Sequence, residues 1–188
     1  MIPPAPAAND RGVSATDLPN NAVADAFRLA MRELATAVCI VTAGCGHKRC
    51  GLTASSVTSL SLSPPSLLVS IQKKSRTLTR ILEGGVFAVN ILAATQRDIG
   101  ADFAGYGLRE GLGRFADPAW IDGRSGVPVL TTSLGAVECR VVHTVAWHTH
   151  VVVFGLVSHV HGQERRDPLI YWRGGYRDVV PSGSNRES

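Results

Sequence analysis

The sequence has 188 residues, of which 45% are hydrophobic and 18% are charged, a composition typical of a soluble domain with a full hydrophobic core. These values exclude a chain that is disordered throughout and exclude a fibrous architecture. The formal net charge of +4 comes from scattered basic residues, so no nucleic-acid-binding surface is predicted.

Signals for export, membranes and metal binding are weak. The segment MIPPAPAAND lacks the basic and apolar stretches of a secretory signal, and the longest strongly apolar run, residues 151–157, is too short to cross a bilayer. The four cysteines form no CxxC pair, which argues against a zinc ribbon or a thioredoxin-like motif. We therefore expect a cytoplasmic protein with reduced thiols and no membrane segment.

The N-terminal half begins with residues 1–20, a segment rich in Pro, Ala, Asn and Asp that is predicted to be a disordered tail. Apolar side chains at helical spacing then predict an amphipathic helix at residues 22–34, with Asn21 as its N-cap. Short β-branched or alternating runs predict strands at residues 37–43, 50–62 and 67–71. Pro64 and Pro65 separate the last two of these strands.

Two short helices are predicted in the middle of the chain. Ser75 can cap the first, whose apolar face is Leu78, Ile81 and Leu82 and which Gly84 and Gly85 end. The second covers residues 95–103, after a predicted strand at residues 86–92, and has Asp98 in its first turn.

The C-terminal half begins with residues 104–126, which hold six glycines and are predicted to be a long loop. Strands are then predicted at residues 136–147, 150–161 and 169–172, followed by a polar tail at residues 181–188. Many short strands with marginal helices predict a mainly β fold, a closed or nearly closed β-barrel with peripheral helices. Residues 21–180 would form this single domain.

The nucleotide-binding motifs with strong signatures do not occur. Gly105, Gly107 and Gly111 have one residue too many for a dinucleotide fingerprint, and they follow a predicted helix, whereas the fingerprint follows a strand. No GxxxxGK[ST] sequence is present, so phosphoryl transfer on a P-loop is excluded.

Two polar segments are candidate ligand sites. Residues 53–59 carry five hydroxyls in a strand-like setting, where hydroxyls and backbone N–H groups can hold a phosphate or the polar edge of a heterocycle. Residues 72–77 place three cations and two hydroxyls where a helix begins, which is an anion site in many proteins. A water-facing Ser/Thr-rich strand and a solvated charged turn remain the alternatives.

Histidines raise the question of a metal site. His148 and His150 would share one strand face, His159 and His161 another, and Cys139 lies nearby in sequence. His-x-His spacing is common by chance and no acidic partner recurs at a fixed offset, so no metal site is predicted.

Read together, the segments resemble the flavin reductase-like family with the FMN-binding split barrel, and in particular the reductase components of two-component flavin monooxygenases. The matching segments appear in the family's order over roughly residues 25–180: FRLAMRELATAVCIVTA, GLTASSVTSLSLSPPSLLVSI, FAVNIL, DFAG, RF, GVPVL, HVVVFGLV and PLIYWRGGYRDV. The resemblance implies a homodimer that reduces FAD or FMN with NADH or NADPH and supplies reduced flavin to a partner monooxygenase.

The resemblance also implies a set of flavin-binding positions. Thr53, Ala54, Ser55 and Ser56 would line the flavin ring and ribityl chain, and Ser75, Arg76 and Thr77 would meet the phosphate. Further positions that would complete the pocket are Val89, Asn90, Phe103, Arg114 and Phe115, with Ser70, Gln72 and Tyr171 flanking them. His150 would be the catalytic residue, as a hydrogen-bonding group for the flavin or the nicotinamide carboxamide.

One motif differs from the family. Where many members have Gly-Asp-His, this chain has His148-Thr149-His150, with Gly155 at the family's offset. A hydroxyl thus replaces a carboxylate beside the retained histidine, and the change bears on the use of the pyridine nucleotide. The alternative functions are a tightly flavin-binding module or electron carrier with little reductase activity, and a metal-binding protein built on the histidines.

Overall fold

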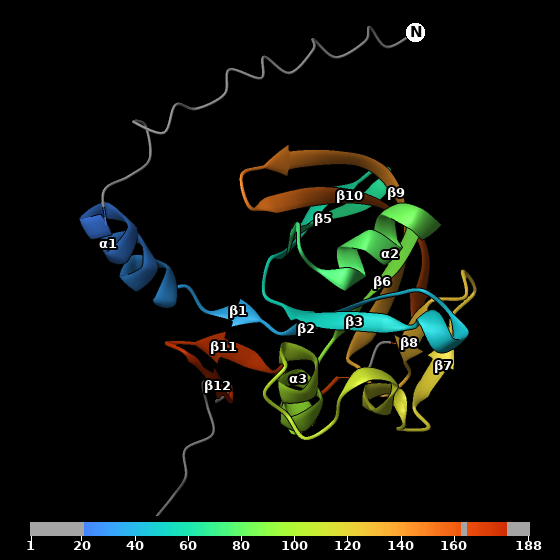
Figure 1. Ribbon diagram of the computed structural model, residues 1–188. Helices are drawn as coiled ribbons and strands as arrows, with labels where there is room; N and C mark the ends of the chain where they lie inside the picture. Colours follow the sequence, from blue (N-terminus) through green and yellow to red (C-terminus); the bar gives the residue numbers. More distant parts are fainter. Residues whose placement is uncertain (1–20, 163–164, 180–188) are drawn as a thin grey trace, which may run out of the picture. The chain divides into compact units, whose positions relative to one another are not determined.

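The computed structural model describes residues 21–162 and 165–179 (Figure 1). The predicted tails at residues 1–20 and 181–188 lie outside these ranges. The chain divides into two compact units, at residues 1–34 and 35–188. In the first unit, α1 (Asn21–Arg32) confirms the predicted helix, but Asn21 is its first helical residue and not the residue before it.

The second unit is built on a seven-stranded antiparallel sheet with the order β3-β2-β6-β9-β10-β5-β4. Its strands are β2 (Cys39–Ala43), β3 (Cys50–Ala54), β4 (Val57–Leu62), β5 (Pro65–Gln72), β6 (Val86–Ile91), β9 (Gly135–Trp147) and β10 (His150–His161). Two small sheets accompany it, formed by β1 (Thr36–Ala37), β11 (Ile170–Trp172) and β12 (Gly175–Arg177), and by β7 (Trp120–Asp122) and β8 (Pro128–Leu130). The predicted mainly β fold is confirmed.

The sheet curls on itself but is not closed by hydrogen bonds. Its two edge strands, β3 and β4, are consecutive in the chain and are joined only by Ser55 and Ser56. A two-residue link spans at most about 11 Å between flanking Cα atoms, so the edges approach each other there. The sequence prediction of one strand at residues 50–62 is therefore wrong: the run alternates without a break, yet the backbone leaves one edge and enters the other.

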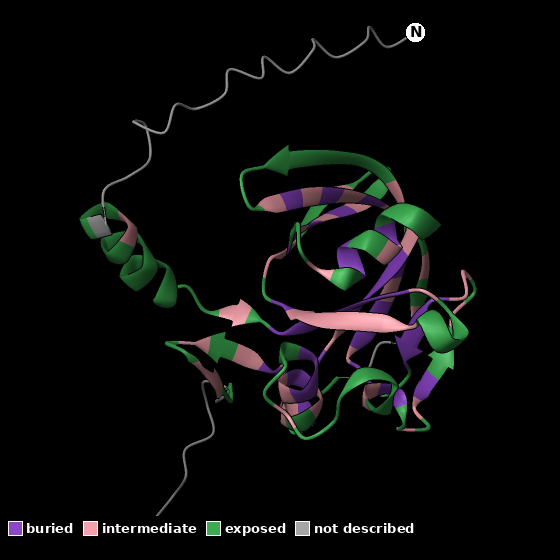
Figure 2. Cartoon of the chain, viewed as in Figure 1, coloured by how far each residue is buried: buried purple, intermediate pink, exposed green. Residues whose placement is uncertain are grey.

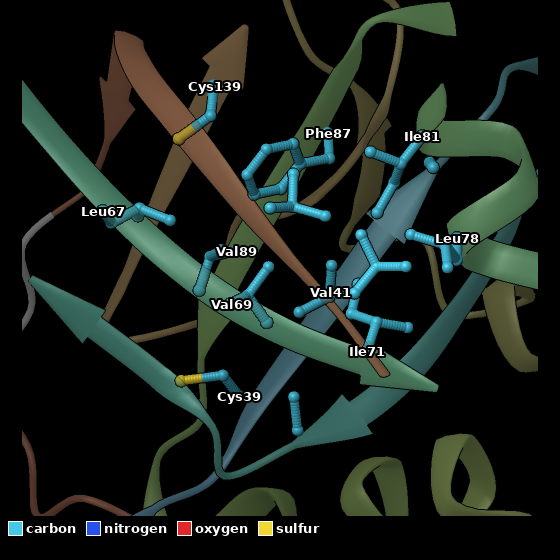
Figure 3. Close-up of a cluster of buried hydrophobic side chains, with 14 residues drawn as sticks. Cys39, Val41, Leu67, Val69, Ile71, Leu78, Ile81, Phe87, Val89 and Cys139 are labelled. Atoms are coloured by element: carbon cyan, nitrogen blue, oxygen red, sulfur yellow. The ribbon is translucent and has the colours of Figure 1, made fainter. Parts of the chain in front are cut away.

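The interior of the curled sheet is the main hydrophobic core (Figure 3). Alternate residues of each strand point into it, because successive side chains of a strand point to opposite faces. Val69 and Ile71 of β5 thus lie beside Val153 and Val151 of β10, their register partners.

The helix α2 (Arg76–Gly84) adds Leu78 and Ile81 to this core, whereas Leu82, predicted to lie on the same face, is exposed. The Ser75 hydroxyl accepts a hydrogen bond from the Thr77 N–H at 3.2 Å, which confirms the predicted N-cap. Gly85 follows in the left-handed conformation at φ 67°, where a residue without Cβ is unstrained.

The second predicted helix and the long loop need a correction. The helix α3 (Arg97–Ala104) follows a 3₁₀ turn at Ala94–Gln96, and Asp98 lies in its first turn as expected. The region 104–126 is not all loop, because it contains a 3₁₀ turn at Gly111–Phe115 and strand β7. Rings of Phe103, Phe115 and Trp120 form a second core that fixes this segment, with ring centroids 5.0–5.4 Å apart. Glycine content masked these aromatic anchors.

Within the described residues, no helix has both the length and the apolar character needed to span a membrane.

Candidate functional site

A cavity of about 650 Å³ opens in the second unit where the sheet is split. Its size falls in the range of small-molecule sites, and its lining combines hydroxyls, aromatic rings and one imidazole. The lining residues are Val38, Leu52, Thr53, Ala54, Ser55, Ser56, Ser70, Ile71, Gln72, Ser75, Phe103, Ala104, Tyr106, His150, Tyr171 and Tyr176. Most of the predicted flavin-binding positions are thus brought together.

The link between the two edge strands forms one wall. Thr53 Oγ1 donates to the Gly100 carbonyl of α3 at 2.7 Å, and Ser56 Oγ donates to the Ser70 carbonyl of β5 at 2.7 Å. These bonds leave both hydroxyl oxygens able to accept but use their protons within the protein. Ser55 is exposed, and its hydroxyl bonds to no other described group. Because β3 is an edge strand, alternate backbone N–H groups along it have no partner strand and remain available to a ligand.

A cationic turn forms the opposite wall. β5 ends at Gln72, Lys73 and Lys74 are exposed, and Ser75 caps α2. No ion-pair partner of these two lysines occurs in the described part of the chain. The N-terminus of a nine-residue helix adds partial positive charge beside them. This wall therefore favours an anionic group at the cavity's edge.

His150 begins β10 and pairs with Gln72 of β5 and Trp147 of β9. Its Nδ1 lies 2.8 Å from the Thr149 hydroxyl. Since Nδ1 is engaged outside the cavity, Nε2 is the ring nitrogen that remains for a ligand.

The three tyrosines of the chain all line the cavity, although only Tyr171 was predicted. Tyr171 and Tyr176 are register partners on β11 and β12 with ring centroids 5.9 Å apart, and the Tyr106 hydroxyl donates to the Tyr176 hydroxyl at 3.0 Å. Burial, together with Tyr106, raises the pKa of Tyr176, so this phenol stays neutral at physiological pH. Sequence reasoning missed two tyrosines because they lie in a glycine-rich loop and a three-residue strand.

Several predicted flavin-binding residues do not line the cavity. Thr77 and Val89 are buried, and Val89 points into the main core. Asn90 is fully buried and cross-links three strands: its Nδ2 donates to the Ile40 carbonyl at 3.1 Å and its Oδ1 accepts from the Leu130 N–H at 2.8 Å. The segment that resembles the family most locally, FAVNIL, is therefore a structural strand here.

The Arg114-Phe115 pair also lies away from the cavity. Phe115 is buried in the second core, and Arg114 Nε donates to the Arg109 carbonyl at 3.2 Å while its guanidinium lies 5.9 Å from the Phe103 ring centroid. These residues support Phe103, which does line the cavity. Arg76 is exposed at the start of α2, next to the cavity-lining Ser75.

The histidines are dispersed. His148 lies in the hairpin turn with φ 45° and not on a strand, and His161 contacts the buried carboxylate of Glu138 at 2.5 Å. Among the described residues, no three His, Cys, Asp or Glu side chains are grouped so that they could hold a metal ion. The structure gives no support to a metal-binding function built on these histidines.

Comparison with known proteins places this geometry in context. Residues 31–180 match the family model described as "Flavin reductase like domain". The "FMN reductase (NADH) RutF 2" of Methylorubrum extorquens (strain PA1) is 37% identical over 163 residues, covering 87% of this chain and 93% of that protein.

Two solved structures share the fold. BorF, "the flavin reductase component of a bacterial two-component tryptophan halogenase", superposes with a TM-score of 0.75 at 31% identity, covering 83% of this chain and 98% of that one. The NADH:FAD oxidoreductase SgcE6 of Streptomyces globisporus C-1027, solved with NAD and FAD fragments, superposes with a TM-score of 0.78 at 27% identity and covers 88% of this chain and 98% of that one.

Proposed function

The chain belongs to the flavin reductase-like family, and from this premise we propose that it reduces FMN or FAD with NADH or NADPH and supplies reduced flavin to a partner monooxygenase. The observation that carries the proposal is the cavity, which joins the split between β3 and β4, a cationic turn and an aromatic wall in one site. Named relatives support it, because they are NADH-dependent flavin reductases.

The residues present fit a flavin. Unpaired backbone groups of edge strand β3 suit the polar edge of a planar heterocycle, and Tyr171 and Tyr176 offer aromatic surface on the other side. When both cofactors are bound, the nicotinamide supplies a hydride and the flavin accepts it. The protein's own task is to hold the two rings in contact and exclude water, and orientation of this kind can lower a barrier by about 7–11 kcal/mol.

His150 is the proposed catalytic residue. It lines the cavity on the same strand pairing as Gln72, and no carboxylate is among the lining residues. A neutral hydrogen-bonding group suits this chemistry, since the hydride moves between cofactors and the protein need not supply a strong acid. Its contact would be with the flavin's polar edge or the carboxamide of the nicotinamide.

The test is consumption of NADH or NADPH by the purified full chain in the presence of free FMN or FAD. The proposal predicts turnover that saturates with both substrates. Tight flavin binding without turnover above the uncatalysed rate would instead show the alternative, a flavin-binding module or electron carrier.

Arg76→Ala is expected to weaken flavin binding by about threefold to tenfold and to flatten its salt dependence. The reason is that Arg76 stands with the helix N-terminus on the side proposed for the phosphate, where surface charge is screened by salt. Fluorescence titration of FMN at two ionic strengths measures both effects. Arg124→Ala, an exposed arginine of another turn, is the control. Equal affinity in the two variants would contradict the placement.

We propose further that the protein is a homodimer formed through the outer face of the sheet. On this face Leu68 pairs with Phe154, and Val152 pairs with Val145, which is 41% exposed. Figure 2 shows the distal half of β9 as exposed. The period of two places Ser70, Gln72 and His150 on the same face, so a second copy seated there would extend the cavity wall.

Val145→Asp is expected to convert this dimer to a monomer, because the substitution buries a carboxylate in an apolar contact. Light scattering at micromolar concentration gives the mass. Ile121→Asp is the matched control, since Ile121 is 42% exposed on β7 in a different sheet. A monomeric wild type, or a Val145→Asp dimer, would overturn this interface.

A further inference from the structure

The hairpin turn between β9 and β10 holds Thr149 firmly beside the cavity. The turn consists of His148 and Thr149, and the flanking Trp147 and His150 pair with each other. The Thr149 carbonyl accepts a hydrogen bond from the Lys73 N–H at 2.9 Å, so the hairpin tip is tied to the cationic turn after β5. The backbone of Thr149 is therefore fixed from both sides.

The hydroxyl of Thr149 lies 2.8 Å from Nδ1 of His150. A carboxylate at this position could only accept, which would require a proton on Nδ1. A hydroxyl can donate, and in a neutral imidazole one nitrogen carries the proton while the other accepts. The residue beside the histidine thus decides which nitrogen presents a proton to the cavity.

We propose that Thr149 is a positioning residue whose hydroxyl donates to Nδ1 and holds His150 in the Nε2–H form, with that N–H directed to the bound cofactors. The charged groups at this corner are Lys73 and Lys74, and the titratable groups lining the cavity besides His150 are the three tyrosines. None of them is acidic, so among these groups none replaces Thr149 as a partner that would reverse the tautomer.

The inference rests on the proposed function for its purpose, since it assigns His150 the role of a hydrogen-bond donor. An Nε2–H group suits an acceptor such as the nicotinamide carboxamide oxygen or the carbonyl edge of the flavin ring. Orientation of the nicotinamide would then depend on this one bond. Loss of the hydroxyl would leave the ring free to exchange tautomers and to turn.

The test uses the full chain labelled with ¹⁵N at histidine, with Thr149→Val, Thr149→Ser and Thr144→Val as variants. Imidazole ¹⁵N shifts report the tautomer directly. We expect Nε2–H for His150 in the wild type and in Thr149→Ser, and a mixture in Thr149→Val. Thr144 is exposed on β9 of the same hairpin and serves as the matched control.

Kinetics with NADH and FMN supply the second readout. Thr149→Val should lower kcat/KM for NADH about tenfold, the loss expected for one positioning hydrogen bond, with KM for FMN unchanged. Thr149→Ser should restore the value to within about twofold, because the retained hydroxyl still donates to Nδ1. A wild-type His150 protonated at Nδ1, or a Thr149→Val variant with unchanged tautomer or unchanged kcat/KM, would overturn the inference. Nε2–H that depends on Thr149 in a protein that does not oxidise NADH would support the tautomer assignment and overturn only the proposed function.

Discussion

Glu138→Gln is expected to lower the free energy of unfolding by about 3–5 kcal/mol, the range measured when a buried charge network loses one member. Glu138 is fully buried on β9, and its carboxylate accepts from the backbone N–H groups of Arg124 and Ser125 at 2.9 and 2.7 Å. The Ser125 hydroxyl and His161 Nε2 are also bonded to it. A glutamine offers one acceptor oxygen to these groups and turns an N–H₂ toward donors, so at least one buried donor is left unpaired.

Urea denaturation of the two proteins measures this loss. Glu83→Gln is the matched control, because Glu83 is 55% exposed and pairs only with Arg80 on the same helix, so its loss should stay below about 1 kcal/mol. A Glu138→Gln protein as stable as the Glu83→Gln control would show that the carboxylate is not what holds the turn at residues 123–126.

The stability of the wild type should also depend on pH through this group. Burial acts to raise the pKa of the Glu138 carboxyl, but the hydrogen bonds from Ser125, His161 and Arg124 outweigh it and lower the pKa to about 2. A carboxyl with a lowered folded-state pKa stabilises the fold above its ordinary pKa and loses that contribution as the pH falls. About 3 kcal/mol is therefore lost between about pH 5 and pH 2, and Glu138→Gln should lack this portion of the pH dependence.

Gly155→Ala is expected to destabilise the fold by about 1–3 kcal/mol through overpacking. Gly155 lies on β10 at a register shift opposite β9, and an added Cβ would stand 2.6 Å from Phe87 Cζ and 2.8 Å from Cys139 Cβ. Phe87 and Cys139 are both fully buried in the main core, as Figure 3 shows, so neither can move without disturbing the packing. The glycine found at the family's offset thus has a structural reason in this chain.

Thermal unfolding is the convenient measurement, with an expected decrease in Tm of about 2–12 °C for a domain of this size. Gly113→Ala is the control, because no atom lies within 4 Å of the Cβ it would add and its φ is not in the left-handed range. An equal Tm for Gly155→Ala and Gly113→Ala would mean that Phe87 can yield at no cost.

The candidate site was predictable where its residues are continuous in sequence. Residues 53–56 and 72–75 carry hydroxyls and cations in short runs, and the structure brings both runs to one cavity. Asn90, Val89 and Phe115 were assigned to the site from family position alone, and they are buried in the fold instead. A conserved-looking segment and a ligand-lining segment have the same appearance when only one sequence is read.

The sequence by itself determined the elements whose signals are local: the Ser75 cap, the helix it begins, and the strands whose β-branched runs are short and bounded by glycine or proline. Side-chain period and capping act within a few residues, so they can be read without the fold. Tertiary structure alone decided the break at Ser55 and Ser56, the meeting of Tyr106 with Tyr176, and the four donors around Glu138. Each of these depends on the curling of one sheet, which places residues far apart in the chain within bonding distance.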